Sequence, residues 1–266
     1  MNSPNRLLHR QQIENQFDRA ASTYDGTAKL QRRMGNMLLQ RIVDLGIEKT
    51  SRLMDLGCGT GELLSQLQAS GFSDLTGLDL SAKMISVAKE KAPTASFVHA
   101  DIEAIPGDGD RFGVVASNAA IQWCDTETAT REIARILRPG GMALLTSFVA
   151  GTLAQWHQAF LAGGYESRVH ALASAVDLQS ALSHAGLAIE EVQTFVETAT
   201  FDSIESMFAS VRHIGATNAM SSRKRAMTRS EYNHLKLHFQ DRLESDGTLE
   251  LDYVWVQIVA KKMAPQ

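Results

Sequence analysis

The stretch MDLGCGTGELLSQL, residues 54–67, places three glycines within five residues, between a short apolar run and a helical pattern. Glycine adopts positive φ without strain, and because it has no Cβ a ligand can approach the main chain closely. In an open parallel sheet, ligands bind beyond the carboxyl ends of the strands. A glycine-rich turn that directly follows a strand therefore predicts a ligand site at residues 57–61.

Apolar runs of strand length alternate with helical segments along most of the chain. The predicted strands cover residues 52–56, 74–80, 95–101, 112–118, 141–148, 186–201 and 251–262. The predicted helices cover residues 7–24, 28–45, 62–70, 81–91 and 126–137, with further helical stretches within 152–186 and 202–245. Strands that alternate with helices indicate an α/β fold with parallel strands and right-handed crossovers.

Composition narrows the class of protein. The chain has 266 residues, 44% of them hydrophobic, and a formal net charge of −4, so its surface as a whole is not built to hold nucleic acid. Signal-peptide and membrane-span patterns are absent, and we expect a cytoplasmic protein. Cys58 and Cys124 are too few for a disulfide framework, and we interpret both as passive walls of the site. His234 and His238 are one helical turn apart but have no third ligand, so we expect no metal.

Three aspartates at the ends of predicted strands suggest what the glycine turn binds. The spacing G-x-G-x-G differs from the dinucleotide fingerprint, and Asp55 beside it would repel a phosphate but suit a cationic amine. Asp79 stands where a carboxylate can accept from ribose hydroxyls. Asp101 could accept from an adenine amino group, with Ile102 along the base. An amine, a ribose and an adenine without phosphate describe S-adenosylmethionine. The alternative is structural, with the glycines forming only a turn and Asp79 capping a helix.

With these motifs, the chain resembles the Rossmann-like, S-adenosylmethionine-dependent methyltransferases. The resemblance covers about residues 50–150, through LMDLGCGTG, LTGLDLSAKMI, HADIEAIP, VVASNAAIQW and ILRPGGMALLTSF. It implies a seven-stranded sheet that is mostly parallel, with the last strand antiparallel. It also implies that S-adenosylmethionine is the methyl donor, S-adenosylhomocysteine the product, and that the cofactor contacts are Tyr24, Gln31, Asp55, Gly57, Cys58, Gly59, Asp79, Leu80, Met84, Asp101, Ile102 and Ser117.

On this basis we expect a single methyltransferase domain over residues 1–266. N-terminal helices occupy residues 1–46 and a cofactor-binding core occupies 50–150. The charged helical stretch 202–247 lies between two predicted strands, and we interpret it as a cap inserted before the last strand.

Three further stretches point to the substrate. In combining FDRAASTYDGTAKLQ (17–31), SNAAIQWCD (117–125) and SVRHIGATN (210–218), the chain resembles the malonyl-acyl-carrier-protein O-methyltransferases of biotin synthesis. That family esterifies the free carboxylate of a malonyl thioester. The stretch NAAIQW also resembles trans-aconitate methyltransferases, which methylate a carboxylate too. A third alternative is a non-catalytic module that binds S-adenosylmethionine and regulates a partner. The sequence does not separate carrier-bound from CoA-bound malonyl, nor does it predict an oligomeric state.

Methyl transfer to a carboxylate needs alignment and exclusion of water, not a base, because the carboxylate is already ionised at neutral pH. We therefore nominate Tyr24, Gln122 and Trp123 as the catalytic residues, and their expected role is to form the walls of the reaction chamber. Arg212, with His213 beside it, is the candidate for holding the substrate carboxylate. The structural alternatives are core packing for the two aromatic residues and a solvated helix surface for Arg212.

A run of basic residues is the remaining feature. Acyl carrier proteins are acidic, and positive patches steer acidic partners. The resemblance thus makes SSRKRAMTRS (221–230) a candidate docking surface for a malonyl-bearing acyl carrier protein, which Arg32 and Arg33 could extend; the alternative is an ordinary solvated surface. The docking residues are Arg223, Lys224, Arg225 and Arg229.

Overall fold

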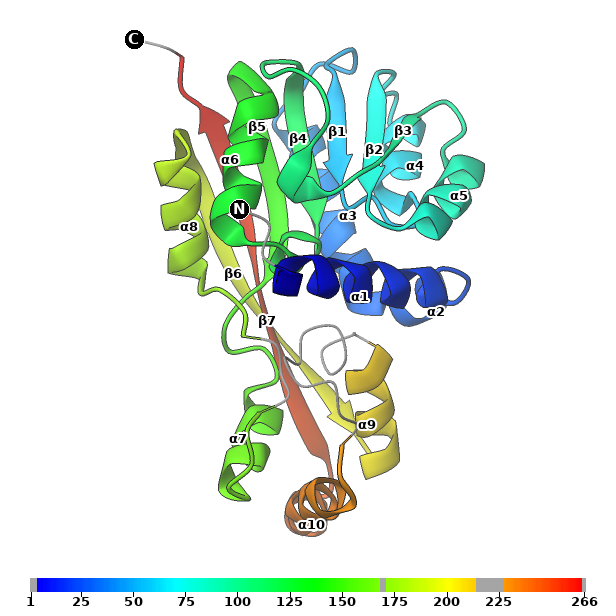
Figure 1. Cartoon of the computed structure of the whole chain (residues 1–266), viewed down its shortest axis with the longest axis vertical. Helices are drawn as coiled ribbons and strands as arrows, with labels where there is room; N and C mark the ends of the chain where they lie inside the picture. Colours follow the sequence, from blue (N-terminus) through cyan, green and yellow to red (C-terminus); the bar gives the residue numbers. More distant parts are fainter. Residues whose placement is uncertain (1–3, 168–170, 214–226, 265–266) are drawn as a thin grey trace. The chain divides into compact units, whose positions relative to one another are not determined.

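A computed structural model of the chain describes residues 4–167, 171–213 and 227–264 (Figure 1). The chain forms two compact units. The larger unit comprises Ile13–Val149, Ala173–Thr194 and Trp255–Gln266. The smaller unit comprises Met1–Gln12, Ala150–Leu172 and Phe195–Val254.

Seven strands form one sheet in the order β3-β2-β1-β4-β5-β7-β6. The pairs from β3 to β5 are all parallel, and β7 runs antiparallel to β5. This confirms the predicted α/β class with a mostly parallel sheet and an antiparallel last strand. The strand bounds are β1 Leu53–Leu56, β2 Leu75–Asp79, β3 Ser96–His99, β4 Phe112–Asn118, β5 Leu137–Phe148, β6 Leu187–Phe201 and β7 Leu249–Lys262.

Helices cover both faces of the sheet in the larger unit. Figure 1 shows α6 (Thr126–Ile136) in front of the strands and α3 (Lys29–Asp44) behind them. Apolar side chains of α3 and α4 (Glu62–Ala69) pack with β1, β2, β4 and β5 into one buried cluster. The remaining elements assigned to this unit are α2 (Tyr24–Thr27), α5 (Ala82–Lys91), η1 (Ile102–Ala104), η2 (Ile121–Trp123) and α8 (Ala175–His184).

The N-terminal helix ends earlier than predicted. Helix α1 runs over Pro4–Ala20, and a turn separates it from α2, so Tyr24 begins a new helix instead of ending the first. The hydroxyl of Thr23 donates to the Ala20 carbonyl at 3.3 Å, and that of Thr27 donates to the Tyr24 carbonyl at 3.1 Å. Such local side-chain bonds compete with a continuous helix. The break turns the chain and places Tyr24 next to the glycine turn.

The smaller unit has its own aromatic core. It contains α7 (Ala154–Ala162), α9 (Ile204–His213) and α10 (Arg229–Asp246). The Trp156 ring lies with its centroid 4.8 Å from that of Phe208 and 5.7 Å from that of Phe239. The predicted cap, residues 202–247, falls within this unit, and its role as a cap stays a prediction. Among the described residues, each helix is too short or too polar to cross a membrane.

Gly61 fixes how the glycine turn (residues 57–61) packs on the rest of the larger unit. It caps the start of α4 with φ of +79°, and a Cβ built on it would lie 2.9 Å from the Cα of Ala88 in α5. An L-residue at this position is thus strained by its backbone and also collides with a neighbouring main chain. Gly71 offers a matched comparison, because its φ is +92° but nothing lies within 4 Å of the added Cβ.

We predict that Gly61→Ala lowers the free energy of unfolding by about 1–3 kcal/mol more than Gly71→Ala does, because only the first substitution adds a steric clash to the backbone strain. Urea unfolding of the two variants and the wild type measures this difference. Equal losses in the two variants would show that the close approach of α5 is not a constraint on the turn.

Candidate functional site

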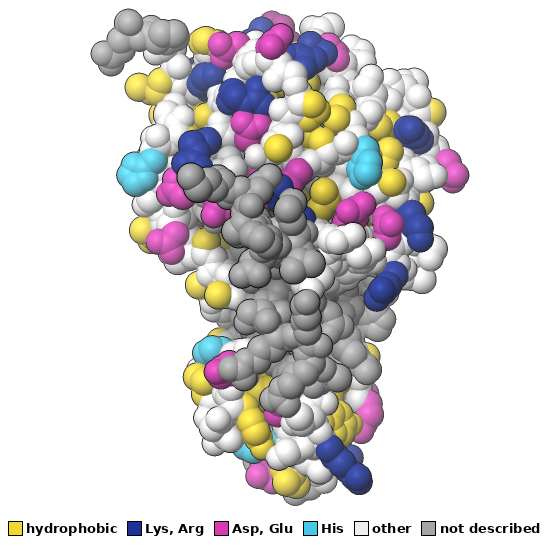
Figure 2. Space-filling view, viewed as in Figure 1, with side chains coloured by type: hydrophobic (Ala, Val, Ile, Leu, Met, Phe, Trp, Pro, Cys, Tyr) yellow, Lys and Arg dark blue, Asp and Glu magenta, His cyan; other side chains and the backbone are white. Residues whose placement is uncertain are grey.

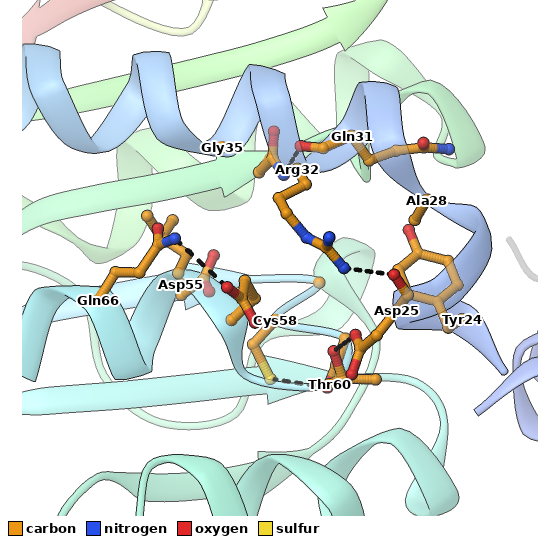
Figure 3. A pocket seen from close by; sticks show the side chains of 15 residues that line it. Tyr24, Asp25, Ala28, Gln31, Arg32, Gly35, Asp55, Cys58, Thr60 and Gln66 are labelled. Atoms are coloured by element: carbon orange, nitrogen blue, oxygen red, sulfur yellow. Dashed lines mark hydrogen bonds between the residues drawn. The ribbon is translucent and has the colours of Figure 1, made fainter. Parts of the chain in front are cut away.

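A hollow opens at the carboxyl end of β1, and we call it the Asp55 pocket. Its volume is about 550 Å³, including space open to solvent. Figure 3 shows Arg32 reaching from α3 into the space beside the glycine turn, with Asp25 and Tyr24 at its far end. The lining residues are Tyr24, Asp25, Ala28, Gln31, Arg32 and Gly35 from the N-terminal helices, Asp55, Gly57, Cys58, Gly59 and Thr60 from β1 and its turn, Glu62, Leu63 and Gln66 from α4, and Asn118 from β4.

Asp55 is the most unusual side chain of this pocket. It is only 2% exposed, and its Oδ1 atom has no hydrogen-bond partner within the described part of the chain. Burial, with a smaller contribution from the charge of Asp79, raises the pKa of Asp55 to about 8. A buried acceptor without a donor costs free energy, and an acidic site that lacks a counter-charge holds its proton. The pocket thus contains a buried acceptor for which the described residues supply no donor.

Asp79 holds the glycine turn in place. One carboxylate oxygen accepts from the N–H of Gly59 and the other from the N–H of Ser81, both at 2.8 Å. The Ser81 hydroxyl then caps α5 by accepting from the N–H of Met84 at 3.1 Å. Burial raises the pKa of Asp79, while these backbone donors act in the opposite sense. Asp79 therefore links the turn after β1 to the turn after β2. It lies next to the pocket but is not one of its lining residues.

The acid of the third strand also makes a local bond. Asp101 lies two residues beyond β3 and accepts from the N–H of Glu103 at 2.8 Å, which caps η1. Ile102 lies beside the glycine turn, since a Cβ built on Gly57 would be 3.7 Å from its Cδ1 atom. Met84 is buried at 1% exposure in α5, and Leu80 accepts from His99 through its carbonyl at 2.8 Å. None of these four residues lines the described pocket.

Ser117 turns away from the pocket. Its side chain is fully buried, and its hydroxyl donates to the carbonyl of Leu56 at 2.8 Å, which ties β4 to the end of β1. Its neighbour Asn118 takes the lining position instead. The Asn118 amide donates to the carbonyl of Gln31 at 2.9 Å and accepts from the Thr146 hydroxyl at 2.7 Å.

The structure brings two of the three nominated wall residues into one aromatic row. Phe17 lies edge-on to Tyr24, with ring centroids 6.3 Å apart, and edge-on to Trp123 at 5.8 Å. Burial, then the charges of Asp79 and Asp25, raise the pKa of Tyr24 to about 12. The Tyr24 phenol is therefore protonated at neutral pH. Tyr24 lines the pocket, and Trp123 does not.

Gln122 has structural partners for its amide. Its Nε2 donates to the carbonyl of Ala119 at 2.6 Å, and its Oε1 accepts from the Ser147 hydroxyl at 3.3 Å. These bonds hold the turn after β4, where Ala119 adopts a φ of +50°. A polar group at this position was expected to face a substrate, and the bonds give it a structural purpose as well.

Several pocket residues were missed by sequence reasoning. Ala28, Arg32 and Gly35 were missed although, together with the predicted Gln31, they follow the i, i+3, i+4, i+7 spacing that places side chains on one helix face. The sequence suggests Arg32 only as an extension of a docking surface, whereas the structure places it in the pocket wall. Asp25, Thr60 and Asn118 gave no comparable signal, because their partners are remote in the chain.

Several predicted residues fall in parts of the chain that the structure describes only in part or not at all. Arg212 and His213 belong to α9, but their side chains are outside the described set. Arg229 is the exposed first residue of α10. On the face shown in Figure 2, the described basic and acidic side chains are interspersed. Outside the described residues lie Arg223, Lys224 and Arg225.

The two cysteines differ in placement. Cys58 is buried and lines the pocket, whereas Cys124 is half-buried and does not line it. Burial raises the pKa of the Cys58 thiol, so it stays protonated and unreactive. The described residues include no group of three or more histidines, cysteines and acids that could hold a metal ion.

Known proteins are similar to this chain in sequence and in fold. Residues 54–145 match the family model described as a methyltransferase domain. The malonyl-[acyl-carrier protein] O-methyltransferase of Enterobacter lignolyticus is 36% identical over 232 residues, which cover 86% of this chain and 90% of the relative. The chain belongs to the malonyl-[acyl-carrier protein] O-methyltransferase family. Another family member, from Salmonella typhimurium, is 32% identical over 88% of this chain and 92% of its own length.

Solved structures agree on the fold. The YcgJ protein of Bacillus subtilis aligns with a TM-score of 0.62 at 16% identity, covering 86% of this chain and 100% of its own. A geranyl diphosphate methyltransferase in complex with S-adenosylmethionine aligns with a TM-score of 0.53 at 14% identity, covering 86% and 84% of the two chains. The methyltransferase fold is therefore shown for this member of the family, which is an enzyme.

We predict that Asp55→Asn changes how stability depends on pH. In the wild-type protein the pKa of Asp55 is raised to about 8, against 3.8 for an ordinary aspartate, so between these values the native state holds a proton that the unfolded state releases. Asp55 therefore makes the protein less stable as the pH rises from about 4 to 8, and the asparagine variant lacks this loss.

Urea unfolding at several pH values measures the effect. The stability of the variant relative to the wild type should rise with pH, by at most about 1.4 kcal/mol per pH unit. Parallel curves for the two proteins would mean that the Asp55 carboxyl does not hold a proton in the native state.

Proposed function

We propose that this enzyme transfers a methyl group from S-adenosylmethionine to the free carboxylate of a malonyl group carried on acyl carrier protein, an early step of biotin synthesis. Membership of the family supports the reaction, and the relatives' names supply the substrate. The observation that carries the cofactor assignment is the buried Asp55 Oδ1 atom, which has no partner in the described residues and needs a cationic donor. A sulfonium nucleoside with a free amino group provides that donor and brings no phosphate.

The pocket residues suit such a cofactor. Asp55 would receive the ammonium group, and Arg32 with Gln31 would receive the carboxylate of the methionine portion, since all three line one pocket. Asp79 borders the same turn and would accept from the ribose, while Asp101 and Ile102 would meet the adenine. The further proposed cofactor contacts are Tyr24, Gly57, Cys58, Gly59, Leu80, Met84 and Ser117. When bound, the cofactor supplies an electrophilic methyl group.

The residues of this chain then have to bind the substrate, align it with the methyl group and exclude water from it. A malonyl carboxylate is ionised at neutral pH and needs no base, and the Tyr24 phenol, with a pKa of about 12, keeps its proton. We assign Tyr24, Gln122 and Trp123 to the walls that align the reacting atoms and exclude water. Arg212 and His213 stay our proposal for holding the substrate carboxylate.

The acyl carrier protein is the proposed partner. Such carriers are acidic, and we propose that Arg223, Lys224, Arg225 and Arg229 draw the carrier to the enzyme through long-range attraction. No nucleic acid or membrane is part of this proposal, and neither is a metal ion.

Methyl transfer to alternative acceptors tests the proposed function. We predict that the enzyme, given S-adenosylmethionine labelled in its methyl group, forms the methyl ester of malonyl-acyl carrier protein or malonyl-CoA faster than that of trans-aconitate. Mass spectrometry of the acceptor and release of label by mild base identify the ester. Faster esterification of trans-aconitate would favour a small-polycarboxylate methyltransferase. Binding of the cofactor without any transfer would favour a regulatory binding module.

We further predict that Arg32→Met weakens binding of S-adenosylhomocysteine by about 10- to 100-fold, as expected for loss of a charge-assisted hydrogen bond. Arg33→Met is the matched control, because Arg33 is the next residue of α3, carries the same charge and does not line the pocket. Calorimetry gives the affinities.

An analogue that lacks the amino-acid carboxylate sharpens this experiment. Arg32→Met should weaken binding of this analogue much less than binding of S-adenosylhomocysteine, because the analogue has no carboxylate to pair with Arg32 and loses only the effect of the hydrogen bond from Arg32 to the Asp25 carbonyl. If both ligands lose affinity equally in this variant, Arg32 shapes the pocket and does not bind the carboxylate.

A further inference from the structure

A continuous segment, residues 13–28, crosses the carboxyl ends of the strands at the Asp55 pocket, and we call it the N-terminal strap. It comprises the last turns of α1, the break after Ala20, and α2. All of it belongs to the larger unit, together with the turns that it contacts. Tyr24 and Asp25 of the strap line the pocket itself.

Asp25 fastens the strap to the glycine turn. One oxygen of its carboxylate accepts from the Thr60 hydroxyl at 2.7 Å, and the other accepts from the ammonium group of Lys91 at the end of α5. Lys91 also reaches Thr60 and Glu62, each at 3.3 Å, so it joins the strap, the glycine turn and α4. Burial alone would raise the pKa of Asp25, but hydrogen bonds from Lys91 and Thr60 hold it below its ordinary value. The carboxylate is therefore charged at neutral pH.

Two further contacts hold the strap over the neighbouring turns. Asp18 accepts from the Ser81 hydroxyl at 2.6 Å, and Ser81 is the residue whose N–H is bound by Asp79. Phe17 contacts Trp123 in the turn after β4. The strap is thus attached to the turns that follow β1, β2 and β4, which are adjacent strands in the sheet.

The ion pair between Asp25 and Lys91 is weak enough to break and re-form reversibly. The side chain of Asp25 is 41% exposed and that of Lys91 27% exposed. A pair so accessible to water contributes far less than a buried one, typically below about 1 kcal/mol. It can be broken by a modest fluctuation, in contrast to the packed strands beneath it.

We propose that Asp25 and Lys91 are positioning residues, which latch the N-terminal strap over the Asp55 pocket and thereby set the rate at which the spent cofactor leaves. The proposal rests on the proposed function, in that the ligand of the pocket is S-adenosylmethionine or its product. Because Tyr24 belongs to the strap and lines the pocket, the strap must move for a ligand to pass on this side. Loss of the latch shortens the closed state without removing any group that binds the ligand directly.

The test compares two charge-neutralising substitutions on the same helix. We expect Lys91→Met to raise the dissociation rate constant of S-adenosylhomocysteine about three- to tenfold, with a smaller change in the association rate constant. Lys89→Met is the matched control, since Lys89 is exposed on α5 and, in the part of the chain that the structure describes, forms no hydrogen bond or ion pair with the strap. It should leave the rate unchanged. Lys91→Arg keeps the charge and should keep release slow. Stopped-flow displacement measures all four proteins.

A second variant and a structural readout separate the latch from general loss of stability. Asp25→Asn should also speed release, and the double variant Asp25→Asn/Lys91→Met should be no faster than the faster single variant, because both remove one contact. Hydrogen exchange of residues 13–28 should quicken in Lys91→Met, while its urea unfolding midpoint stays near that of the wild type.

The outcomes discriminate between the proposals. Release from Lys91→Met and Asp25→Asn at the wild-type rate would overturn the latch while leaving the proposed function in place. Equal acceleration by Lys89→Met would also overturn it, because the effect would then be one of net charge. If the wild type does not bind S-adenosylhomocysteine at all, the proposed function fails, and the latch fails with it.

Discussion

The site depends on one buried acid. Asp55 stands at the end of β1 with 2% of its surface exposed, and its Oδ1 atom lacks a donor among the described residues. Burying a carboxyl group in this way is unfavourable unless the group is neutral or meets a positive charge. Burial raises its pKa to about 8, so the neutral form predominates at neutral pH. A ligand that brings an ammonium group would remove this penalty, which is the basis of our cofactor assignment for Asp55.

The glycine turn and Asp79 form the surroundings of Asp55. Asp79 binds the N–H groups of Gly59 and Ser81, which fixes the ends of β1 and β2 relative to each other. A carboxylate that accepts two backbone donors retains lone pairs for a third partner. Structural capping and ligand binding are therefore not exclusive roles for Asp79. The same holds for Asp101, whose carboxylate caps η1.

The N-terminal helices complete the pocket from the opposite side. Arg32 and Gln31 lie on the α3 face that meets the pocket, while Tyr24 and Asp25 come from α2. Both positive and negative groups therefore line the pocket, which would suit a zwitterionic amino acid. On the side of the strap, the attachments use the half-buried carboxylates of Asp18 and Asp25, whereas the four residues of β1 at the floor of the pocket are all buried. A firm floor beneath a weakly held cover is suited to an enzyme that must exchange one sulfur nucleoside for another in every cycle.

The local sequence already contained the order of strands and helices, the glycine turn and the sequence of acids at 55, 79 and 101, because apolar periodicity and turn chemistry act over a few residues. The antiparallel last strand followed from the family resemblance. Tertiary structure decided which side chains face the pocket. Thr60 meets Asp25 across 35 residues of chain, and Ser117 turns to Leu56 across 61. Such bonds depend on where distant segments meet, and no local pattern encodes their geometry. For this reason Asp25 and Asn118 emerged as pocket residues only from the folded chain.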